Sequence, residues 1–565
     1  MNILYVVAIS AVVLGVAYLT YGKFLSKKVF QTDNDNPGPA VTMEDGKDFV
    51  SAKRGMLMGQ HFSAIAAAGP INGPILAATM FGWLPALLWV VLGSIFVGGV
   101  HDYGSLVASV RNKAKSITDV IRIYVSRRAW ILFMVFIWIA LVYVLVAFTD
   151  ITASAFVGNV TLESGEVVKG GAIASSSIMY LILPMIMGLL IRFGGLKEWL
   201  AALIFLPLVG VAIWAGQFIP VSLPFAEIIT QQKAWGVLIL IYCLVASITP
   251  MWLILQPRGA VGGYFLYAAL FFAAIGIAFG GYTVNYPAFV TPPAATSFWT
   301  PMFPVLFITI ACGACSGFHA LISSGTTSKQ LSCEVDAKPV AYGTMLLEGM
   351  VGVVSIACVM ILTTNSELIS KAPNFVYASA LGDFMQLIGI PATFGISFGL
   401  MAFTTFVYDT LDVCTRLGRY IVQEITGLKG KTGAFISTFV TAGAPAFFIF
   451  QTSTDAAGKP IPVWRMFWNT FGASNQLLAA LALIGISIWL MKTRKNTKVW
   501  LVSFIPAVFM LIMSNWALVA AVYDGFVLGK GNKVIPVVSV VLIVLSLFVA
   551  IETFTVMFRK EREGK

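Results

Sequence analysis

Residues 69–74 read Gly69-Pro70-Ile71-Asn72-Gly73-Pro74, within the apolar stretch Leu57–Ala78. Two prolines and two glycines in six residues cannot continue a regular α-helix, because proline lacks a backbone donor and glycine has low helix propensity. In a bilayer, the backbone groups freed by such a break must bond to protein, water or a ligand. The stretch therefore predicts a discontinuous membrane helix with a binding site at its break.

The rest of the chain has the composition of a membrane protein. Of its 565 residues, 58% are hydrophobic and 11% are charged, and the mean hydropathy is +0.89. A water-soluble domain of this length could not bury so much apolar surface, so the surrounding medium is lipid. The net charge of +11 then reflects basic residues near the lipid headgroups, and we expect no nucleic-acid partner.

We predict an all-α polytopic membrane protein with fifteen spans, most of which reach the roughly 20 residues that a helix needs to cross a bilayer. The spans are Ile3–Gly22, Leu57–Ala78, Gly82–Ala108, Trp130–Phe156, Ile173–Ile191, Trp199–Ile219, Ala234–Gln256, Val261–Gly281, Met302–Ser324, Val340–Thr363, Thr393–Asp412, Ala434–Phe450, Thr470–Met491, Val499–Tyr523 and Val534–Phe558. A short apolar stretch, Ala378–Pro391, is predicted to form a non-spanning outer helix.

The basic residues orient these spans. Of the 36 Lys and Arg residues, 29 lie in every second loop and seven in the others. By the positive-inside rule, the N-terminus is predicted to lie outside and the tail Arg559–Lys565 in the cytoplasm. We therefore expect a multi-pass protein of the cell inner (plasma) membrane.

A second interruption is predicted in the seventh span, at Ser247-Ile248-Thr249-Pro250. It lies five spans after the first, so the two broken helices run in opposite directions, which is typical of the five-plus-five inverted repeat of LeuT-like transporters. The predicted units are a first helix and cytoplasmic linker (1–56), two repeats (57–233 and 234–412) and four accessory helices (413–565). Ordinary proline kinks are the alternative.

A substrate site is expected between the two breaks. The N-termini of half-helices carry unpaired N–H groups and the positive end of the helix dipole, which suit a carboxylate. The predicted substrate-binding residues are Gly69, Pro70, Asn72, Gly73, Ser247 and Thr249.

Ionisable residues inside the spans are the next candidates, because they are costly in a membrane and usually functional. The chain has three histidines, His61, His101 and His319, and all lie at a similar level near the cytoplasmic side. With Asp102 and Glu348 they are predicted to form a proton relay or inner gate, since histidine titrates near neutral pH. Interior histidines bonded to backbone and a metal site are the alternatives.

Three further predictions concern neighbouring residues. Burial of Glu348, in a span without Lys or Arg, favours its protonated form and makes it the candidate coupling group. The hydroxyls of Ser323, Ser324 and Thr327 either cap a helix end or bind a sodium ion. Asp412 and Arg416 stand four positions apart and are predicted to pair, as a gate or a structural link.

Four strings carry a family resemblance: Gly59–Pro70, Thr309–Thr327, Leu411–Arg416 and Phe471–Leu477. With these strings, spread over roughly residues 50–490, the sequence resembles the carbon starvation protein A family. The resemblance implies an inner-membrane nutrient importer induced on carbon limitation, with short peptides and pyruvate as substrates of family members. It also implies kinship with the amino acid–polyamine–organocation transporters, which have the inverted repeat.

Single residues can be carried over from this resemblance. His61, His319, Glu348 and Asp412 match family positions. The chain departs from the family at Gln60, where members carry a second histidine, and at His101, where glutamine is frequent. The second departure weakens a metal site at His101.

We therefore predict a secondary-active, proton-coupled importer of pyruvate or short peptides that works by alternating access. A sodium-coupled carrier and a passive channel for small organic solutes are the alternatives. The chain contains no nucleotide-binding loop and no recognisable nucleophile–base set, so we expect neither an enzyme nor a cofactor.

Overall fold

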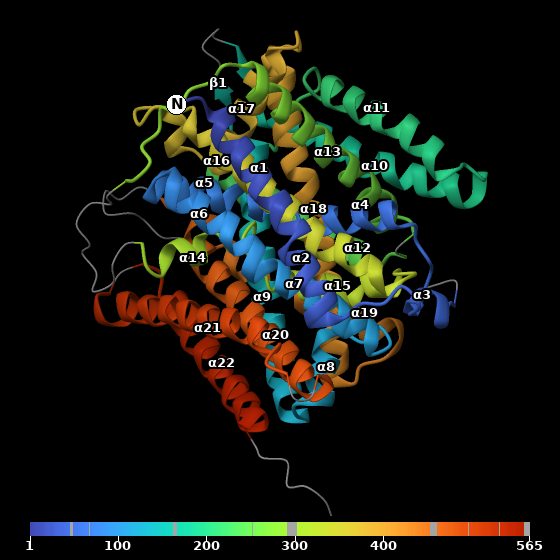
Figure 1. Cartoon of the computed structure of the whole chain (residues 1–565). Helices are drawn as coiled ribbons and strands as arrows, with labels where there is room; N and C mark the ends of the chain where they lie inside the picture. Colours follow the sequence, from blue (N-terminus) through green and yellow to red (C-terminus); the bar gives the residue numbers. More distant parts are fainter. Residues whose placement is uncertain are drawn as a thin grey trace, which may run out of the picture.

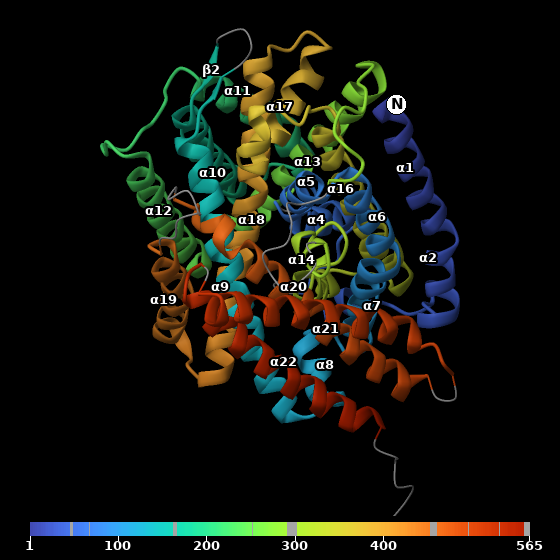
Figure 2. The same ribbon diagram turned by 90° about the vertical axis from the view of Figure 1, so that its left-hand side faces the viewer.

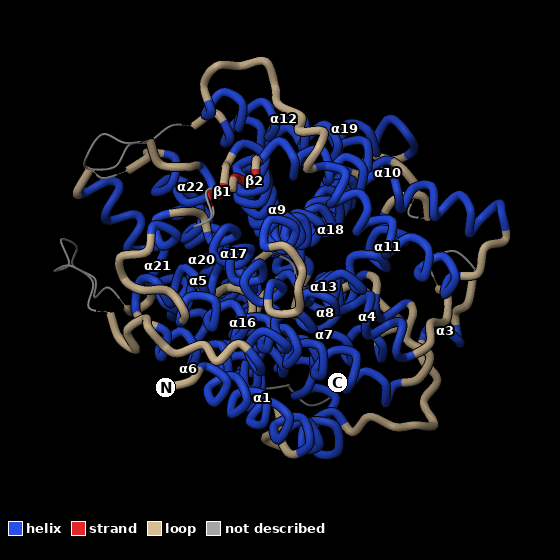
Figure 3. Tube along the Cα trace, turned by 90° about the horizontal axis from the view of Figure 1, so that it is seen from above, coloured by secondary structure: helices blue, strands red, loops and turns tan. Residues whose placement is uncertain are grey.

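The structure is a computed structural model and is almost entirely helical (Figures 1 to 3). It describes residues 1–45, 49–66, 68–161, 166–250, 252–290, 302–451, 460–494, 497–529 and 531–558, without the side chains of Glu198 and Gln256. The predicted cytoplasmic tail Arg559–Lys565 lies outside the described residues.

The α-helices are α1 (Ile3–Leu19), α2 (Tyr21–Phe24), α3 (Pro39–Thr42), α4 (Arg54–Ile65), α5 (Gly69–Phe81), α6 (Trp83–Gly93), α7 (Gly99–Arg111), α8 (Ile117–Tyr124), α9 (Arg127–Val157), α10 (Gly170–Gly194), α11 (Glu198–Gly216), α12 (Ile228–Ile248), α13 (Leu255–Phe279), α14 (Val305–Thr309), α15 (Phe318–Gly325), α16 (Thr344–Met360), α17 (Pro373–Gln386), α18 (Ala392–Thr426), α19 (Gly430–Ile449), α20 (Val463–Thr493), α21 (Leu501–Val522) and α22 (Val534–Phe558). Short π- or 3-10-helical segments are η1 (Leu25–Phe30), η2 (Ser94–Gly98), η3 (Thr327–Lys329), η4 (Glu334–Asp336), η5 (Lys338–Gly343), η6 (Glu367–Ser370) and η7 (Tyr523–Val527). Strands β1 (Val160–Thr161) and β2 (Val167–Val168) pair antiparallel.

Among the described residues, thirteen helices are long and apolar enough to cross a membrane, and α4 with α5, bent by 48°, makes a fourteenth. The prediction of an all-α polytopic membrane protein is confirmed. The predicted span Met302–Ser324 is not a single helix, because the chain unwinds between α14 and α15. The predicted outer helix corresponds to α17, which is not among the candidate spans and packs, mostly buried, against α18.

The long helices α9 and α18 pack against each other at the centre of the bundle (Figure 3), and α20 packs against α9. In the most apolar window of α18 and of α20, 94% of the residues are buried, against 28% in α12 and in α21. Helices α18 and α20 therefore face protein, whereas α12 and α21 present most of their surface to lipid.

Two broken helices lie side by side and antiparallel near this centre. A Cβ atom on Gly73 of α5 would lie 2.6 Å from the Thr309 carbonyl oxygen, at the end of α14. At the other end, His61 of α4 lies 2.8 Å from the Thr327 hydroxyl, just beyond α15. The second half of one broken helix thus lies against the first half of the other, in the arrangement expected of paired broken helices.

The partner of the first broken helix is not the predicted one. Helix α12 runs without interruption to Ile248, so the prediction of a break at mid-depth in the seventh span is wrong. Thr249 is extended (φ −75°, ψ 147°). This is the conformation that a following proline imposes, so Pro250 ends the helix instead of breaking it.

The packing of the remaining helices shows a regular pattern. Helix α12 packs against both α9 and α18, and so does α19. Helix α13 packs against α4 and α18, while α20 packs against α14, α15 and α9. Helices α10 and α11 form a pair at the side of the bundle (Figures 1 and 3).

Candidate functional site

The segment Ile310–Gly317 leaves the helical conformation in the interior of the bundle. Gly313 has a φ of +86°, a backbone conformation that favours glycine. Helix α20 supplies partners for the freed carbonyls: Gln476 Nε2 donates to the carbonyl oxygens of Phe307 and Ile310, at 3.1 Å each. A buried helix thus meets the hydrogen-bonding demand of the break inside the membrane.

Asn475, beside Gln476, caps the start of α15. Its Oδ1 accepts from the Phe318 N–H at 3.1 Å, and its Nδ2 donates to Ser316 Oγ at 3.0 Å. Its backbone carbonyl accepts from the Gly317 N–H at 3.2 Å. The positive end of α15 is therefore already satisfied by protein, and a substrate carboxylate could reach it only by displacing Asn475.

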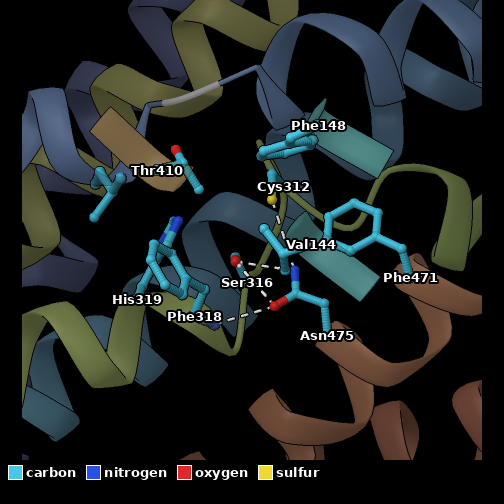
Figure 4. Close-up of a pocket in the computed structure, with 10 residues that line it drawn as sticks. Val144, Phe148, Cys312, Ser316, Phe318, His319, Thr410, Phe471 and Asn475 are labelled. Carbon is cyan, nitrogen blue, oxygen red and sulfur yellow. Dashed lines mark hydrogen bonds between the residues drawn. The ribbon is translucent and has the colours of Figure 1, made fainter. Parts of the chain in front are cut away.

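A narrow pocket of about 20 Å³, room for about one water molecule, lies beside the unwound segment (Figure 4). Its lining residues are Ile65, Val144, Phe148, Cys312, Ser316, Phe318, His319, Thr410, Phe471 and Asn475. Figure 4 shows His319 and Thr410 on one side and Phe471 on the other. Its lining, apolar with a few convergent polar groups, has the composition of a small-molecule site. Its volume is well below the roughly 300–1,000 Å³ of such sites, so a substrate can enter only if the surrounding helices move apart.

His319 connects this pocket to a chain of buried ionisable groups. Its Nδ1 lies 2.8 Å from Asp102 Oδ2, and Asp102 Oδ1 lies 2.7 Å from His101 Nδ1. Its Nε2 lies 3.4 Å from Glu348 Oε2, within ion-pair distance but without hydrogen-bond geometry. All four side chains are completely buried. The structure thus brings together four of the predicted residues, from α7, α15 and α16.

Glu348 continues the chain to the unwound segment. Its Oε1 accepts from the Gly313 N–H at 3.0 Å. Although no Lys or Arg lies in its span, Glu348 therefore has two partners, a backbone N–H and His319. A change of charge on Glu348 acts directly on the backbone beside the pocket.

His61 and the hydroxyl-bearing residues in and just after the last turn of α15 bond mainly to one another and to the surrounding helices. His61 Nδ1 lies 2.8 Å from Thr327 Oγ1, and Ser324 Oγ accepts from the Ile117 N–H at 2.9 Å. Of the three hydroxyls considered as sodium ligands, only that of Ser323 has no hydrogen-bond partner within the described part of the chain. The helix-end role of these hydroxyls therefore has more support from the geometry than the cation role.

Four of the six predicted substrate-binding residues lie at the first break. Gly69, Pro70, Asn72 and Gly73 form the beginning of α5. Asn72 is fully buried, and neither atom of its amide has a hydrogen-bond partner among the residues that the structure describes. A buried amide without partners is costly, so it marks a position where a polar ligand can bind.

Ser247 and Thr249 are not brought to this break. Ser247 Oγ lies 3.4 Å from Thr438 Oγ1 of α19, and Thr249 Oγ1 donates to the Val245 carbonyl at 2.7 Å. Both residues lie at the end of the continuous helix α12, which explains their separation from the predicted site.

Sequence reasoning missed a second buried cluster, centred on Arg258 of α13. Arg258 Nε lies 2.8 Å from Asp409 Oδ1, and its Nη2 lies 2.5 Å from Asp412 Oδ2. The only signal in the sequence was a single arginine between two apolar stretches, together with two aspartates three positions apart on one helix.

The predicted pair of Asp412 with Arg416 is wrong. Arg416 Nη2 instead donates to the carbonyl oxygens of Ala246 and Thr249, at 2.8 Å each. These carbonyls belong to the C-terminal end of α12, where helix carbonyls lack intrahelical partners and attract cations.

The histidine cluster does not have the geometry of a metal site. Within the described ranges, no group of three or more His, Cys, Asp and Glu side chains could hold a metal ion. The two ring nitrogens of His319 face different carboxylates, so the groups form a chain and do not converge on one point.

The family model for the carbon starvation protein CstA matches residues 2–376 and 363–517. The chain belongs to this family. The peptide transporter CstA of Helicobacter pylori is 30% identical over 91% of this chain and 81% of its own length. The peptide transporter CstA of Bacillus subtilis is 29% identical, over 92% and 90%. The pyruvate/proton symporter BtsT of Escherichia coli is 29% identical, over 91% and 81%.

Solved structures are similar at lower levels. MhsT in complex with L-phenylalanine has a TM-score of 0.48 at 13% identity, covering 83% of this chain and 99% of that one. A mutant of the Eremococcus coleocola manganese transporter has a TM-score of 0.46 at 14% identity, covering 92% and 99%. The relatives are named as transporters, and this chain is accordingly a multi-pass membrane protein of a transporter family.

Proposed function

We propose that this chain is a proton-coupled secondary carrier of the inner membrane that imports pyruvate or short peptides during carbon limitation. Its relatives named as peptide transporters and as a pyruvate/proton symporter support the substrate class. The observation that carries the coupling is the position of His319, which lines the pocket and also bonds to Asp102 in the buried chain. A proton on the chain and a substrate in the pocket therefore act on one side chain.

Glu348 is the proposed coupling residue. When it is ionised, its bond from the Gly313 N–H is charge-assisted and stronger than a neutral hydrogen bond. A proton on Glu348 weakens this bond and reduces its attraction to a protonated His319. The unwound segment, which brings Cys312 and Ser316 to the pocket, is then less tightly held, so proton uptake and release change the shape of the site.

The substrate carboxylate has two proposed partners. One is His319 in its protonated form, and the other is the positive end of α5, a helix of 13 residues. Asn72, in the same helix end, is the proposed polar contact for the rest of the substrate. The end of α15 is held by Asn475, so the site depends on one half-helix more than on the other.

The helix contacts support an inverted repeat with new boundaries. We infer that α4–α5, α6–α7, α9, α12 and α13 form the first repeat, and that α14–α15, α16, α18, α19 and α20 form the second. Helices α10 and α11 are then an insertion, and α1, α21 and α22 are accessories. This division replaces the predicted repeats at 57–233 and 234–412, because the second broken helix is α14–α15.

Transport in proteoliposomes tests the proposal. We expect labelled pyruvate, a labelled dipeptide or both to accumulate under an inward proton gradient, and a protonophore to abolish the accumulation. Replacing sodium by choline should leave the rate unchanged. Counterflow without a gradient separates a carrier from a channel, since only a carrier exchanges internal for external substrate. Accumulation driven by sodium alone, or an absence of counterflow, would contradict the proposal.

A further inference from the structure

Arg258 is a large charged side chain that is almost completely buried, with 1% of its surface exposed. It lies near the beginning of α13, directly after Pro257. Besides its ion pairs with Asp409 and Asp412 of α18, it donates to the hydroxyl of Tyr242 on α12. Three helices therefore meet at one guanidinium.

One of the carboxylates around Arg258 also bonds to the first broken helix. Ser63, in α4, donates to Asp409 Oδ2 at 3.2 Å, and the Tyr242 hydroxyl donates to Asp412 Oδ2 at 3.0 Å. A Cβ atom on Gly262 would lie 2.7 Å from Asp409 Oδ2 and 3.3 Å from Ser63 Oγ. Only a bare glycine backbone lets α4, α13 and α18 approach so closely.

The composition of this cluster is that of a cation site. Two carboxylates and two hydroxyls provide only oxygen atoms, the ligands that hard cations such as sodium prefer. The positive charge comes from the protein itself, because the guanidinium lies within ion-pair distance of both carboxylates. Removal of one partner of a buried ion pair leaves an uncompensated charge, which the cluster must then neutralise from outside.

We propose that Arg258 is a tethered cation that fills an oxygen-lined cation position between α4, α13 and α18, so that the carrier needs no free sodium there. The half-helix α4 is joined to this cluster through Ser63 and Asp409, and the charge that balances Asp409 is tethered and cannot dissociate. The inference adds a reason for the sodium independence of the proposed carrier. Its test reads out ion binding, however, and gives an answer whether or not pyruvate or peptides are transported.

The test compares Arg258→Met with the parent and with Arg258→Lys, each purified in detergent. Thermal unfolding is followed while sodium chloride replaces choline chloride at constant ionic strength, and binding of radioactive sodium is measured directly. We expect Arg258→Met to gain saturable sodium binding and a sodium-dependent rise in melting temperature. The parent and Arg258→Lys, which keep the internal charge, should show neither effect.

Sodium stabilisation of the parent equal to that of Arg258→Met would overturn the proposal, and so would a folded Arg258→Met that binds no sodium. If Arg258→Met is too unstable to purify, the double variant Arg258→Met with Asp412→Asn removes one charge of each sign and keeps the carboxylate of Asp409. It should still bind sodium, and adding Asp409→Asn should abolish that binding. Sodium binding that persists without either carboxylate would place the ion elsewhere and contradict the proposal.

Discussion

Asn72 is a buried amide without hydrogen-bond partners among the described residues. A substitution there should therefore affect transport without lowering the stability of the fold. Leucine has a similar shape and no polar atoms, and replacing an unsatisfied polar group in this way is neutral or stabilising. We expect Asn72→Leu to insert with an unchanged or higher melting temperature but to lose uptake. Uptake at the parent's rate would remove Asn72 from the binding site.

Glu348 can be tested by removing its charge while keeping its acceptor. In Glu348→Gln the amide oxygen can still accept from the Gly313 N–H, which now lies at 3.0 Å from the carboxylate. We expect this variant to retain substrate counterflow and to lose accumulation driven by a pH gradient. Glu552→Gln in α22, where the carboxylate accepts from Ser126, is the matched control and should behave like the parent. If Glu348→Gln still concentrates substrate, the coupling group is another residue, with His319 and His61 next in line.

Asn475 should affect both stability and substrate binding, because one side chain caps α15 and lines the pocket. Loss of a helix cap costs about 0.5–2 kcal/mol. We therefore expect Asn475→Ala to lower the melting temperature and to raise the substrate concentration needed for half-maximal uptake. Asn515→Ala in α21, where the amide bonds to Leu511 and Ser546, controls for loss of an asparagine away from the pocket. An Asn475→Ala variant with the parent's kinetics would show that the substrate does not bind in this pocket.

Among the helices, the spans could be read from the sequence, but one of the two breaks could not. Long apolar runs predict spans because the bilayer imposes their length. Residues 310–317 contain no proline, and their unwinding depends on Asn475 and Gln476, whose side chains bond to Ser316 and Ile310 across 159 and 166 positions of sequence. At Thr249 the sequence predicted a break that is absent, because Pro250 ends helix α12 and does not interrupt a longer helix.

The close approach of the two broken helices gives a prediction for Gly73. An added methyl group there would lie 2.6 Å from the Thr309 carbonyl oxygen and 3.2 Å from Ile310 Cα, and both of these are backbone atoms that cannot move aside easily. We expect Gly73→Ala to lower uptake and stability together. Gly443→Ala in α19, where nothing lies within 4 Å of the new methyl group, should do neither. Equal behaviour of the two variants would show that the contact between α5 and α14 is not required.

At the scale of the whole molecule, the sequence predicts which polar residues gather but not which pocket they border. His101, Asp102, His319 and Glu348 could be grouped because their spans place them at one depth. The pocket could not be predicted, because its lining comes from α4, α9, the unwound segment, α15, α18 and α20. The predicted pair of Asp412 with Arg416 failed for the same reason. The rule used the spacing within one helix, but Asp412 pairs with Arg258 on another helix.

The orientation of the bundle follows from the charge distribution and can be tested directly. Lys113 lies in a loop predicted to be cytoplasmic, and Thr283 lies in a loop predicted to be external; both are exposed. With Cys333, the one cysteine that is not buried, replaced by serine, we expect Thr283→Cys to react with an impermeant maleimide in intact cells. Lys113→Cys should react only after permeabilisation. The reverse labelling pattern would show that the predicted orientation in the membrane is wrong, and with it the direction of the proposed import.

The hydrogen bonds between α20 and the unwound segment have a consequence for the speed of the transport cycle. Asn475 and Gln476 hold that segment largely through amide side chains. Asn475 also lines the pocket, where a bound carboxylate can accept from its amide N–H and a peptide group can both donate and accept. A substrate in the pocket can therefore replace a hydrogen-bond partner of the amide, so that no group is left without a partner. We therefore expect the barrier to rearrangement to reflect the rotation of side chains such as Asn475, with no turn of helix melting and reforming in each round.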